Sequence, residues 1–281
     1  MRKRAKRVPK WKRRVRDWMR YAVWIGGPVL ILFFLVLIVK TVTSPTASLP
    51  SEPDRIKAAI VDQIALLSPN QELIDTAVGY LGDAGFDVDI YEGEDVTVEF
   101  YKTLPARGYE LIVVRTHSSN VEFIDDVPQQ EGPVFLFTGE PHDKQRYTLE
   151  HLTDQIRATK LLYDESSMFF AIGPEFVKRS MTGRFEDTLI LIGGCQSMIT
   201  SGLARALVER GASAVIGWDD WVDLSHNDEA IIHLLYSLTA EGLTVEQAVE
   251  KTMSEVGPDS IYKSVLTYFP PERGGYTLPR Q

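Results

Sequence analysis

The only cysteine and one of the five histidines are placed where they could act together as a nucleophile and a base. Cys195 follows the apolar run TLILI (188–192) in a Gly-Gly-Cys turn, and His117 follows the apolar run YELIVVRT (109–116). A thiol attacks a carbonyl as the thiolate, and a nearby imidazole can act as the base or as the cation that stabilises this anion. If both runs are neighbouring parallel strands, their ends meet at the sheet edge where ligands bind.

Each of these residues also has a purely structural interpretation. A lone cysteine beside a strand is often a small buried apolar group, and a histidine can be a hydrogen-bonded core residue. The Gly-Gly-Cys turn after the strand favours a functional thiol, whereas a redox role is disfavoured because no second cysteine can resolve an oxidised one.

The sequence predicts no cofactor. His142 and His151 lack metal-ligand spacing, and His226 and His233 have no further ligand to complete a zinc set. The chain also lacks GxGxxG and GxxxxGK[ST] loops, so a nucleotide is not expected.

The segments that must position Cys195 and His117 alternate between strands and helices. Apolar runs predict strands at 58–67, 86–90, 109–116, 188–192 and 214–217, although the first could also be a short helix. Apolar positions spaced three and four residues apart predict helices at 69–82, 96–104, 202–210, 228–239 and 245–256. The less regular stretch 120–187 indicates strands at 134–138 and 168–172 and a helix at 149–161. This alternation predicts an α/β fold with a mostly parallel sheet covered on both faces.

Charge divides the 281 residues into two parts. Twelve of the 30 basic residues lie in the first 40 positions beside one acid, whereas the rest of the chain is strongly acidic. Residues 21–39 carry no charge, and at about 1.5 Å per residue a helix of that length approaches the ~30 Å hydrocarbon core of a membrane. The alternatives are a buried core helix and a cleaved signal peptide, but the nearest cleavage position, Ala47, has Pro45 where a small residue is needed.

We therefore expect a single-pass protein of the cell membrane with four parts. These are a basic arm at 1–20, a transmembrane helix at 21–40, a Ser/Thr/Pro-rich linker at 41–54 and a folded domain at 55–281. The positive-inside rule places the N terminus in the cytoplasm and the globular domain outside it. The arm is expected to contact anionic membrane lipid and not nucleic acid, because it lies directly beside the span.

The stretch LILIGGCQSMITSGLARALVERGASAVIGWDDWVD (189–223) resembles the catalytic half of caspase-like (clan CD) cysteine peptidases, nearest the CHAT, gingipain and clostripain branches. The segment AEGLTVEQAVEKTM (240–253) continues the likeness, and YELIVVRTHSS (109–119) matches the strand that carries the family's histidine. The resemblance covers about 57–255 and is specific over 188–224. It implies a caspase-like three-layer sandwich with a mostly parallel central sheet.

By this resemblance Cys195 is the nucleophile and His117 is the general base and acid. The backbone N–H groups of Cys195 and Ser118 would form the oxyanion hole. The family usually has glycine after the histidine, where this chain has Ser118, and the caspase pattern Q-A-C-x-G is replaced by G-G-C-Q-S. These departures leave open a geometry that no longer turns over substrate.

The resemblance also points to a substrate pocket in the loop after the 214–217 strand. Asp219, Asp220 and Asp223 would select Arg or Lys before the cut through a charge-assisted pair, with Trp218 or Trp221 as a wall. Solvated acids and packed indoles are the alternative interpretation.

Two hypotheses follow for the function. The first is a membrane-anchored cysteine endopeptidase, a thiol protease that hydrolyses protein or peptide substrates through a Cys195/His117 dyad, with a preference for cutting after a basic residue. The second is a catalytically inactive caspase-like domain that binds a partner and is tethered to the membrane.

Overall fold

A computed structural model describes residues 56–279 except 121, 125–126, 130–131 and 162–163. The predicted basic arm, transmembrane helix and linker at 1–54 lie outside the described residues. Within the described part of the chain, no helix is long and apolar enough to cross a membrane.

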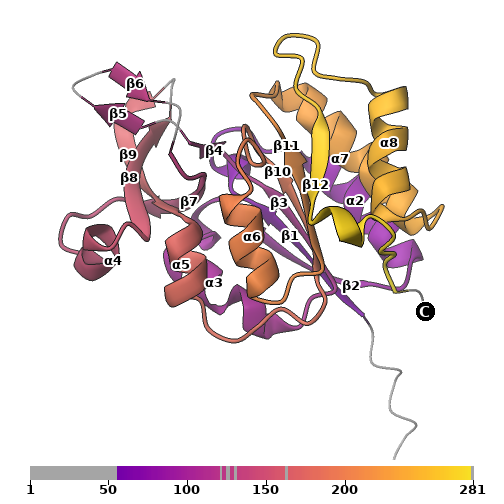
Figure 1. The fold of residues 1–281 in the computed structure, drawn as a ribbon, viewed down its shortest axis with the longest axis horizontal. Coiled ribbons are helices and arrows are strands. Elements are labelled where there is room, and N and C mark those ends of the chain that lie inside the picture. The colour runs from indigo at the N-terminus through magenta and orange to yellow at the C-terminus, as the bar shows by residue number, and fades with distance from the viewer. Residues whose placement is uncertain (1–55, 121, 125–126, 130–131, 162–163, 280–281) are drawn as a thin grey trace, which may run out of the picture. The chain divides into compact units, whose positions relative to one another are not determined.

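Six strands form the main sheet, in the order β12-β11-β10-β3-β1-β2 (Figure 1). Neighbouring strands pair in parallel except β12, which runs antiparallel to β11. The strands are β1 (Lys57–Asp62), β2 (Asp87–Glu92), β3 (Leu111–Arg115), β10 (Leu189–Gly193), β11 (Ala214–Trp218) and β12 (Leu266–Phe269). The segment 58–67 is thus a strand only as far as Asp62, and β12 was not predicted.

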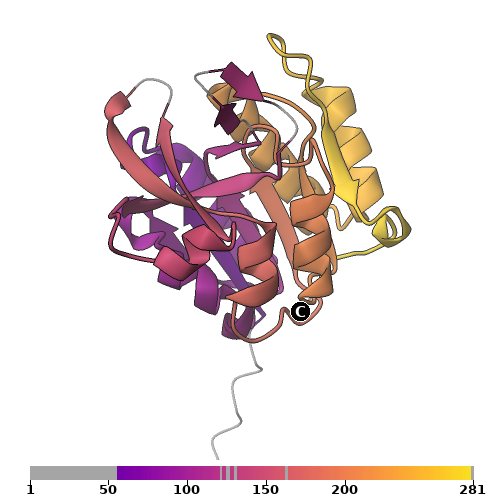
Figure 2. The same cartoon turned by 60° about the vertical axis from the view of Figure 1, so that its left-hand side comes forward.

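Helices cover both faces of this sheet (Figures 1 and 2). One apolar cluster joins the sheet to α3 (Val98–Thr103), α5 (Pro174–Arg179) and α6 (Gly202–Glu209). The other joins it to α2 (Gln71–Asp83), α7 (Leu224–Thr239) and α8 (Val245–Glu255). The period of two along each strand explains the division, since Val113 faces the second cluster and Val114 the first. The predicted α/β class with a mostly parallel sheet is confirmed.

The two helices that flank the carboxyl edge of the sheet on the second face begin at side-chain caps. The Asn70 carboxamide oxygen accepts from Leu73 N at 3.1 Å and starts α2. The Asp223 carboxylate accepts from Ser225 N at 3.0 Å and starts α7. Each cap satisfies a backbone N–H that the helix itself cannot, and so fixes where the helix begins.

A smaller antiparallel sheet, in the order β4-β7-β9-β8, grows out of the end of β3. Its strands are β4 (Ser118–Ser119), β7 (Phe135–Pro141), β8 (Ile156–Leu161) and β9 (Asp164–Ile172), with the helix α4 (Thr148–Leu152) and the hairpin strands β5 (Glu122–Ile124) and β6 (Val127–Gln129) in the same region. Short 3-10 turns are η1 (Ile64–Leu66), η2 (Gly93–Asp95), η3 (Leu104–Arg107) and η4 (Pro271–Arg273).

The predicted helix at 149–161 is wrong beyond Leu152. Residues 156–161 pair with β9 instead, and Ile156 is buried there. At the start of this segment, Leu149 and Leu152 lie at the surface, where they are 67% and 80% exposed. A helix without a buried apolar face gains little from packing, so strand pairing determines the structure of 156–161.

Candidate active site at the carboxyl edge of the sheet

The ends of three strands meet at the same edge of the main sheet. Asp62 and Arg115 end β1 and β3, and they lie opposite each other in the parallel register. Arg115 also lies opposite Gly193, which ends β10 two residues before Cys195. The carboxyl ends of parallel strands are where ligands bind in open α/β sheets, so this edge is the candidate site.

The segments that carry His117 and Cys195 are in direct contact. Thr116 N donates to Gly193 O at 3.1 Å, and Ser118 Oγ donates to Cys195 O at 2.6 Å. Gly194 lies between them, and a Cβ atom added there would stand 2.5 Å from both Ser118 Oγ and Thr116 O. The close approach of the two strand ends therefore requires glycine at this position.

The thiol of Cys195 points toward the apolar cluster of α2, α7 and α8, where it is partly buried. Its Sγ donates to Val222 O at 3.5 Å. Burial raises the pKa of the Cys195 thiol above its ordinary value, and the negative charges of Asp259 and Asp220 raise it further. Cys195 is therefore a thiol, not a thiolate, at neutral pH.

The imidazole of His117 lies toward the small sheet. Its ring centroid is 6.0 Å from that of Phe137, and its backbone N donates to Gln63 Oε1 at 3.0 Å. Burial lowers the pKa of His117 to about 4, with a further contribution from the charge of Arg115. The imidazole is therefore neutral at physiological pH. Among the described residues, no interaction joins this ring to Cys195 Sγ, so the structure brings together the two backbones and not the two side chains.

The backbone N–H of Ser118 is one of the two groups expected in the oxyanion hole. The register between β4 and β7 determines the direction in which it points. Ser118 lies opposite Leu136, and Phe137 N donates to His117 O at 2.9 Å. Hydrogen-bonded and non-hydrogen-bonded pairs alternate in an antiparallel ladder, so Ser118 belongs to a non-hydrogen-bonded pair and its N–H points away from β7.

The residue after the thiol has an unusual environment that the sequence did not reveal. Gln196 adopts a left-handed backbone conformation with φ of 57°, and only 1% of it is exposed. Its backbone N donates to Asp220 O at 2.8 Å, whereas its side-chain Oε1 has no hydrogen-bond partner among the described residues. Leaving a buried acceptor without a donor costs free energy, and such unsatisfied groups occur at functional sites.

The three predicted substrate-binding acids all have partners within the fold. Asp219 Oδ1 accepts from Val265 N at 2.8 Å, and Asp220 Oδ1 accepts from Trp221 N at 2.8 Å. Asp223 caps α7, and its hydrogen bonds from Ser225 lower the pKa of its carboxyl group. These contacts hold each carboxylate in one orientation.

Trp218 ends β11 and Trp221 lies in the loop after it, and the two side chains have different environments. Trp218 is 1% exposed, and its indole N–H donates to Asn227 Oδ1 at 2.9 Å, so it packs in the core and presents no surface to a substrate. Trp221 is partly exposed, with its ring centroid 6.5 Å from that of Tyr262.

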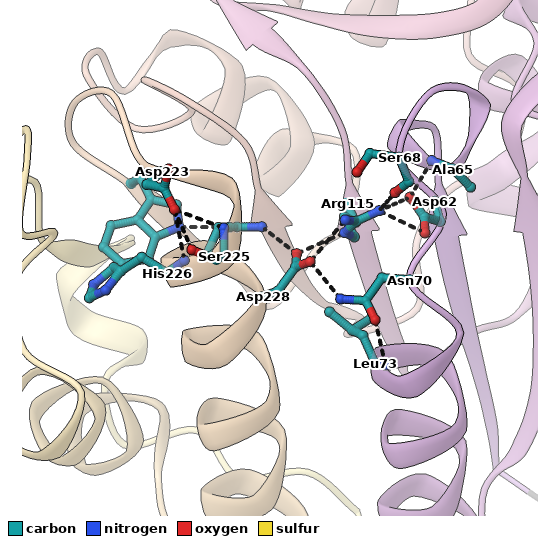
Figure 3. Close-up of polar contacts among 12 residues, drawn as sticks. Asp62, Ala65, Ser68, Asn70, Leu73, Arg115, Asp223, Ser225, His226 and Asp228 are labelled. Atoms are coloured by element: carbon teal, nitrogen blue, oxygen red, sulfur yellow. Dashed lines mark hydrogen bonds and ion pairs between the residues drawn. The ribbon is translucent and has the colours of Figure 1, made fainter.

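A network of buried charged residues lies at the carboxyl ends of β1 and β3 (Figure 3). The sequence analysis did not predict it. Arg115 donates to Asp228 through Nε at 2.7 Å and Nη2 at 2.8 Å, and to Asp62 through Nη1 at 2.9 and 3.0 Å. Nη1 also donates to Ser68 O at 3.1 Å, and Asn70 Nδ2 donates to Asp228 Oδ2 at 2.9 Å. One feature of the sequence could have indicated this network, because the apolar strands KAAIVD and LIVVR each end in a charged residue.

An acidic cavity of about 800 Å³ opens between the N-terminal ends of α2 and α7, with Arg115 among its lining residues. Its other charged lining residues are Glu72, Asp223, Asp228 and Glu229. The volume is in the range of ligand sites, and the excess of carboxylates favours a cationic group. Asp223 directly follows Val222, whose carbonyl accepts from the thiol of Cys195.

Comparison with known proteins gives limited help. No family model and no curated protein matches the chain. Among the solved structures that match, the crystal structure of the Drosophila initiator caspase Dronc is 13% identical, covers 79% of this chain and 80% of its own, and superimposes with a TM-score of 0.38. A superposition this loose leaves the function to be inferred from the residues of this chain.

Proposed function

We propose that the protein is a membrane-anchored cysteine endopeptidase in which Cys195 is the nucleophile and His117 is the general base. The observation that carries the proposal is the contact between the two strand ends, through Thr116 N to Gly193 O and Ser118 Oγ to Cys195 O. The membrane anchor is inferred from the uncharged run at 21–39 in the sequence.

The resting thiol and neutral imidazole fit a general-base mechanism. His117 would accept the thiol proton as Sγ forms a bond to the substrate carbonyl carbon, and would then protonate the leaving amine. Water would then attack the thioester carbonyl as His117 accepts one of its protons, and His117 would return this proton to the departing sulfur of Cys195. The backbone N–H groups of Cys195 and Ser118 would stabilise the oxyanion. Before attack, Sγ must leave Val222 O and the imidazole must turn from Phe137 toward the sulfur.

A preference for a basic residue beside the cut is supported by the acidic cavity. Asp223 lines this cavity, and the preceding residue, Val222, contacts the thiol. An arginine or lysine side chain held by Asp223 and Glu229 would thus lie close to the nucleophile, and a charge-assisted pair would give it specificity. Asp228 contributes less, because Arg115 and Asn70 already occupy its oxygens.

A catalytically inactive binding domain is the second candidate. The raised pKa of Cys195 and the separate environments of its thiol and the His117 imidazole favour it, because both reduce the population of thiolate.

Labelling of the full-length protein in detergent micelles separates the two candidates. A peptide acyloxymethyl ketone that ends in arginine should modify Cys195 of the wild type, as measured by mass spectrometry of the digest. The reaction should be lost in Cys195→Ala and reduced at least about a hundredfold in His117→Ala, because general-base catalysis contributes ~10²–10⁴-fold. His142→Ala, which changes a histidine in the small-sheet region, is the matched control and should react like the wild type. Equal, slow alkylation of wild type and His117→Ala would instead support the binding domain.

A further inference from the structure

The short helix α4 in the small-sheet region presents both of its leucines to solvent. Leu149 is 67% exposed and Leu152 is 80% exposed, and no residue of this helix is buried. Figure 1 shows α4 beside β8, at the periphery of the folded domain. A helix this short gains stability mainly when an apolar face packs against something, so its leucines would stabilise it only if another molecule covered them.

A methionine of a neighbouring strand extends this apolar surface. Met168 on β9 is 40% exposed, and it lies two residues before Phe170, so both side chains point to the same face of the small sheet. On that face the ring of Phe170 packs against those of Tyr147 and His151, with centroids 5.0 and 5.8 Å away. Tyr147 precedes α4 and His151 belongs to it, so the helix and the methionine share one face.

Basic side chains border this face. Lys160 on β8 lies directly opposite Met168 in the antiparallel ladder, and residues directly opposite each other point to the same side of a sheet. Lys144 and Arg146 are exposed in the segment that leads into α4. Residues 143–160 contain four basic and three acidic side chains, whereas the chain from residue 41 onward is strongly acidic. Apolar side chains beside lysine and arginine are typical of surfaces that lie in a membrane interface.

The proposed anchor keeps a membrane within reach of this surface. The linker predicted at 41–54 spans up to about 50 Å when extended. A compact domain of the size of 55–281 has a radius of gyration of about 17 Å. A bilayer that holds the uncharged run at 21–39 is therefore present near the domain at a high effective concentration.

We propose that Leu149, Leu152 and Met168, together called the α4 surface, insert into the interface of the membrane that anchors the protein. This inference rests on the anchor in the proposed function and not on the peptidase reaction. A protein partner is a poorer occupant, because a stable interface buries about 1,000 Å² or more and these three side chains offer much less. Insertion into a bilayer needs no such complementary surface.

The loop between α8 and β12 carries the other prominent pair of exposed apolar side chains in the described part of the chain. Ile261 is 63% exposed and Tyr262 is 46% exposed, and the buried carboxylate of Asp259 accepts from the backbone N of both. The ring of Tyr262 neighbours that of Trp221, which directly follows Asp220. Anionic lipid repels such acidic surroundings, so this loop provides the control for the α4 surface.

The test locates a fluorescent label in the full-length protein, reconstituted into vesicles of phosphatidylcholine and phosphatidylglycerol. Leu152→Cys is combined with Cys195→Ser, which removes the native thiol, and is labelled with bimane. Part of the phosphatidylcholine carries a doxyl quencher on its acyl chain. Ile261→Cys in the same background is the matched control, because its side chain is also exposed but lies in the acidic surroundings of the other loop.

We expect doxyl lipid to reduce the emission of the label at 152 at least about twofold and to leave the label at 261 nearly unchanged. Leu149→Ser/Met168→Ser should weaken the quenching at 152, because less apolar area remains to insert. No quenching at 152, or equal quenching at both positions, would overturn the proposal.

Flotation of the same vesicles separates this inference from the proposed function. Protein that floats with the vesicles without quenching at 152 would keep the anchor and overturn the α4 surface. Protein that does not float would overturn both. Quenching at 152 in a wild-type background that cleaves no peptide would support the α4 surface and count only against the peptidase.

Discussion

Two sets of polar residues lie at the carboxyl edge of the main sheet. They differ in how many of their side-chain donors and acceptors form hydrogen bonds. In the network of Asp62, Arg115 and Asp228, the guanidinium donates to both carboxylates and to a backbone carbonyl. His117 lies two residues after Arg115, and its imidazole forms no hydrogen bond with any residue that the structure describes. Hydrogen bonds fix the orientation of the side chains in the network, whereas none fixes the orientation of the His117 imidazole among the described residues.

We expect this difference to separate a structural role of the network from the reactive role proposed for His117. A buried charge is tolerated when all of its hydrogen-bonding positions are occupied, and such a group stabilises one arrangement of the elements around it. An imidazole without a hydrogen-bond partner among the described residues can change its orientation when a substrate arrives, and so can a thiol held only by a long contact to Val222 O. The two groups therefore respond differently to mutation and to pH.

The largest expected effect comes from the network. Arg115→Met leaves Asp62 and Asp228 buried without their cation, and we expect the free energy of unfolding to fall by about 3–5 kcal/mol in urea denaturation. Lys178→Met is the control, because it breaks a surface ion pair with Glu175 and should cost less than about 1 kcal/mol. Similar losses in the two variants would contradict the structural role of the network.

A smaller effect is expected from pH. Because the pKa of His117 is lowered to about 4 in the folded protein, the unfolded chain takes up a proton first as pH falls. The contribution of His117 to stability is therefore complete above about pH 6.5 and is lost toward pH 4, with a loss of about 2 kcal/mol between pH 7 and pH 5. His117→Gln should remove this part of the pH dependence in urea titrations at pH 7, 6 and 5. An unchanged pH dependence in the variant would show that the ring titrates normally in the fold.

The smallest effect concerns the thiol. Asp220→Asn removes a negative charge that raises the pKa of Cys195 and keeps an oxygen that can accept from Trp221 N. We expect the rate of alkylation by iodoacetamide at pH 8 to rise about threefold, because more of the sulfur is thiolate. Asp83→Asn, at the exposed end of α2, should leave the rate unchanged. A rate that does not change in Asp220→Asn would show that the charge of Asp220 does not control this thiol.

Much of the fold was predictable because local patterns and tertiary packing agree. The runs that became β3, β10 and β11 are continuous apolar strands that alternate with helices, as a parallel sheet covered on both faces requires. The predicted helix at 149–161 failed at 156–161, where the chain pairs with β9 instead. The edge strand β12 was missed because only four residues pair, and it is too short to show a period.

The site was predictable in position and not in detail. The ends of two apolar runs place Cys195 and His117 at one edge, but which way each side chain turns depends on neighbours such as Phe137 and Val222. Asp62, Arg115 and Asp228 belong to three separate elements, so only the folded chain reveals their contact. The same holds for Asp259, whose three backbone donors are set by the shape of its loop.

The smaller sheet has a mechanical relation to the imidazole that follows from chain connectivity. Only Thr116 and His117 separate the end of β3 in the main sheet from the start of β4 in the small sheet. His117 thus forms part of the joint between the two sheets, and a displacement of the small sheet is transmitted along the chain to its backbone torsions. A molecule that binds the small sheet and displaces it would therefore rotate the imidazole without contacting the sulfur.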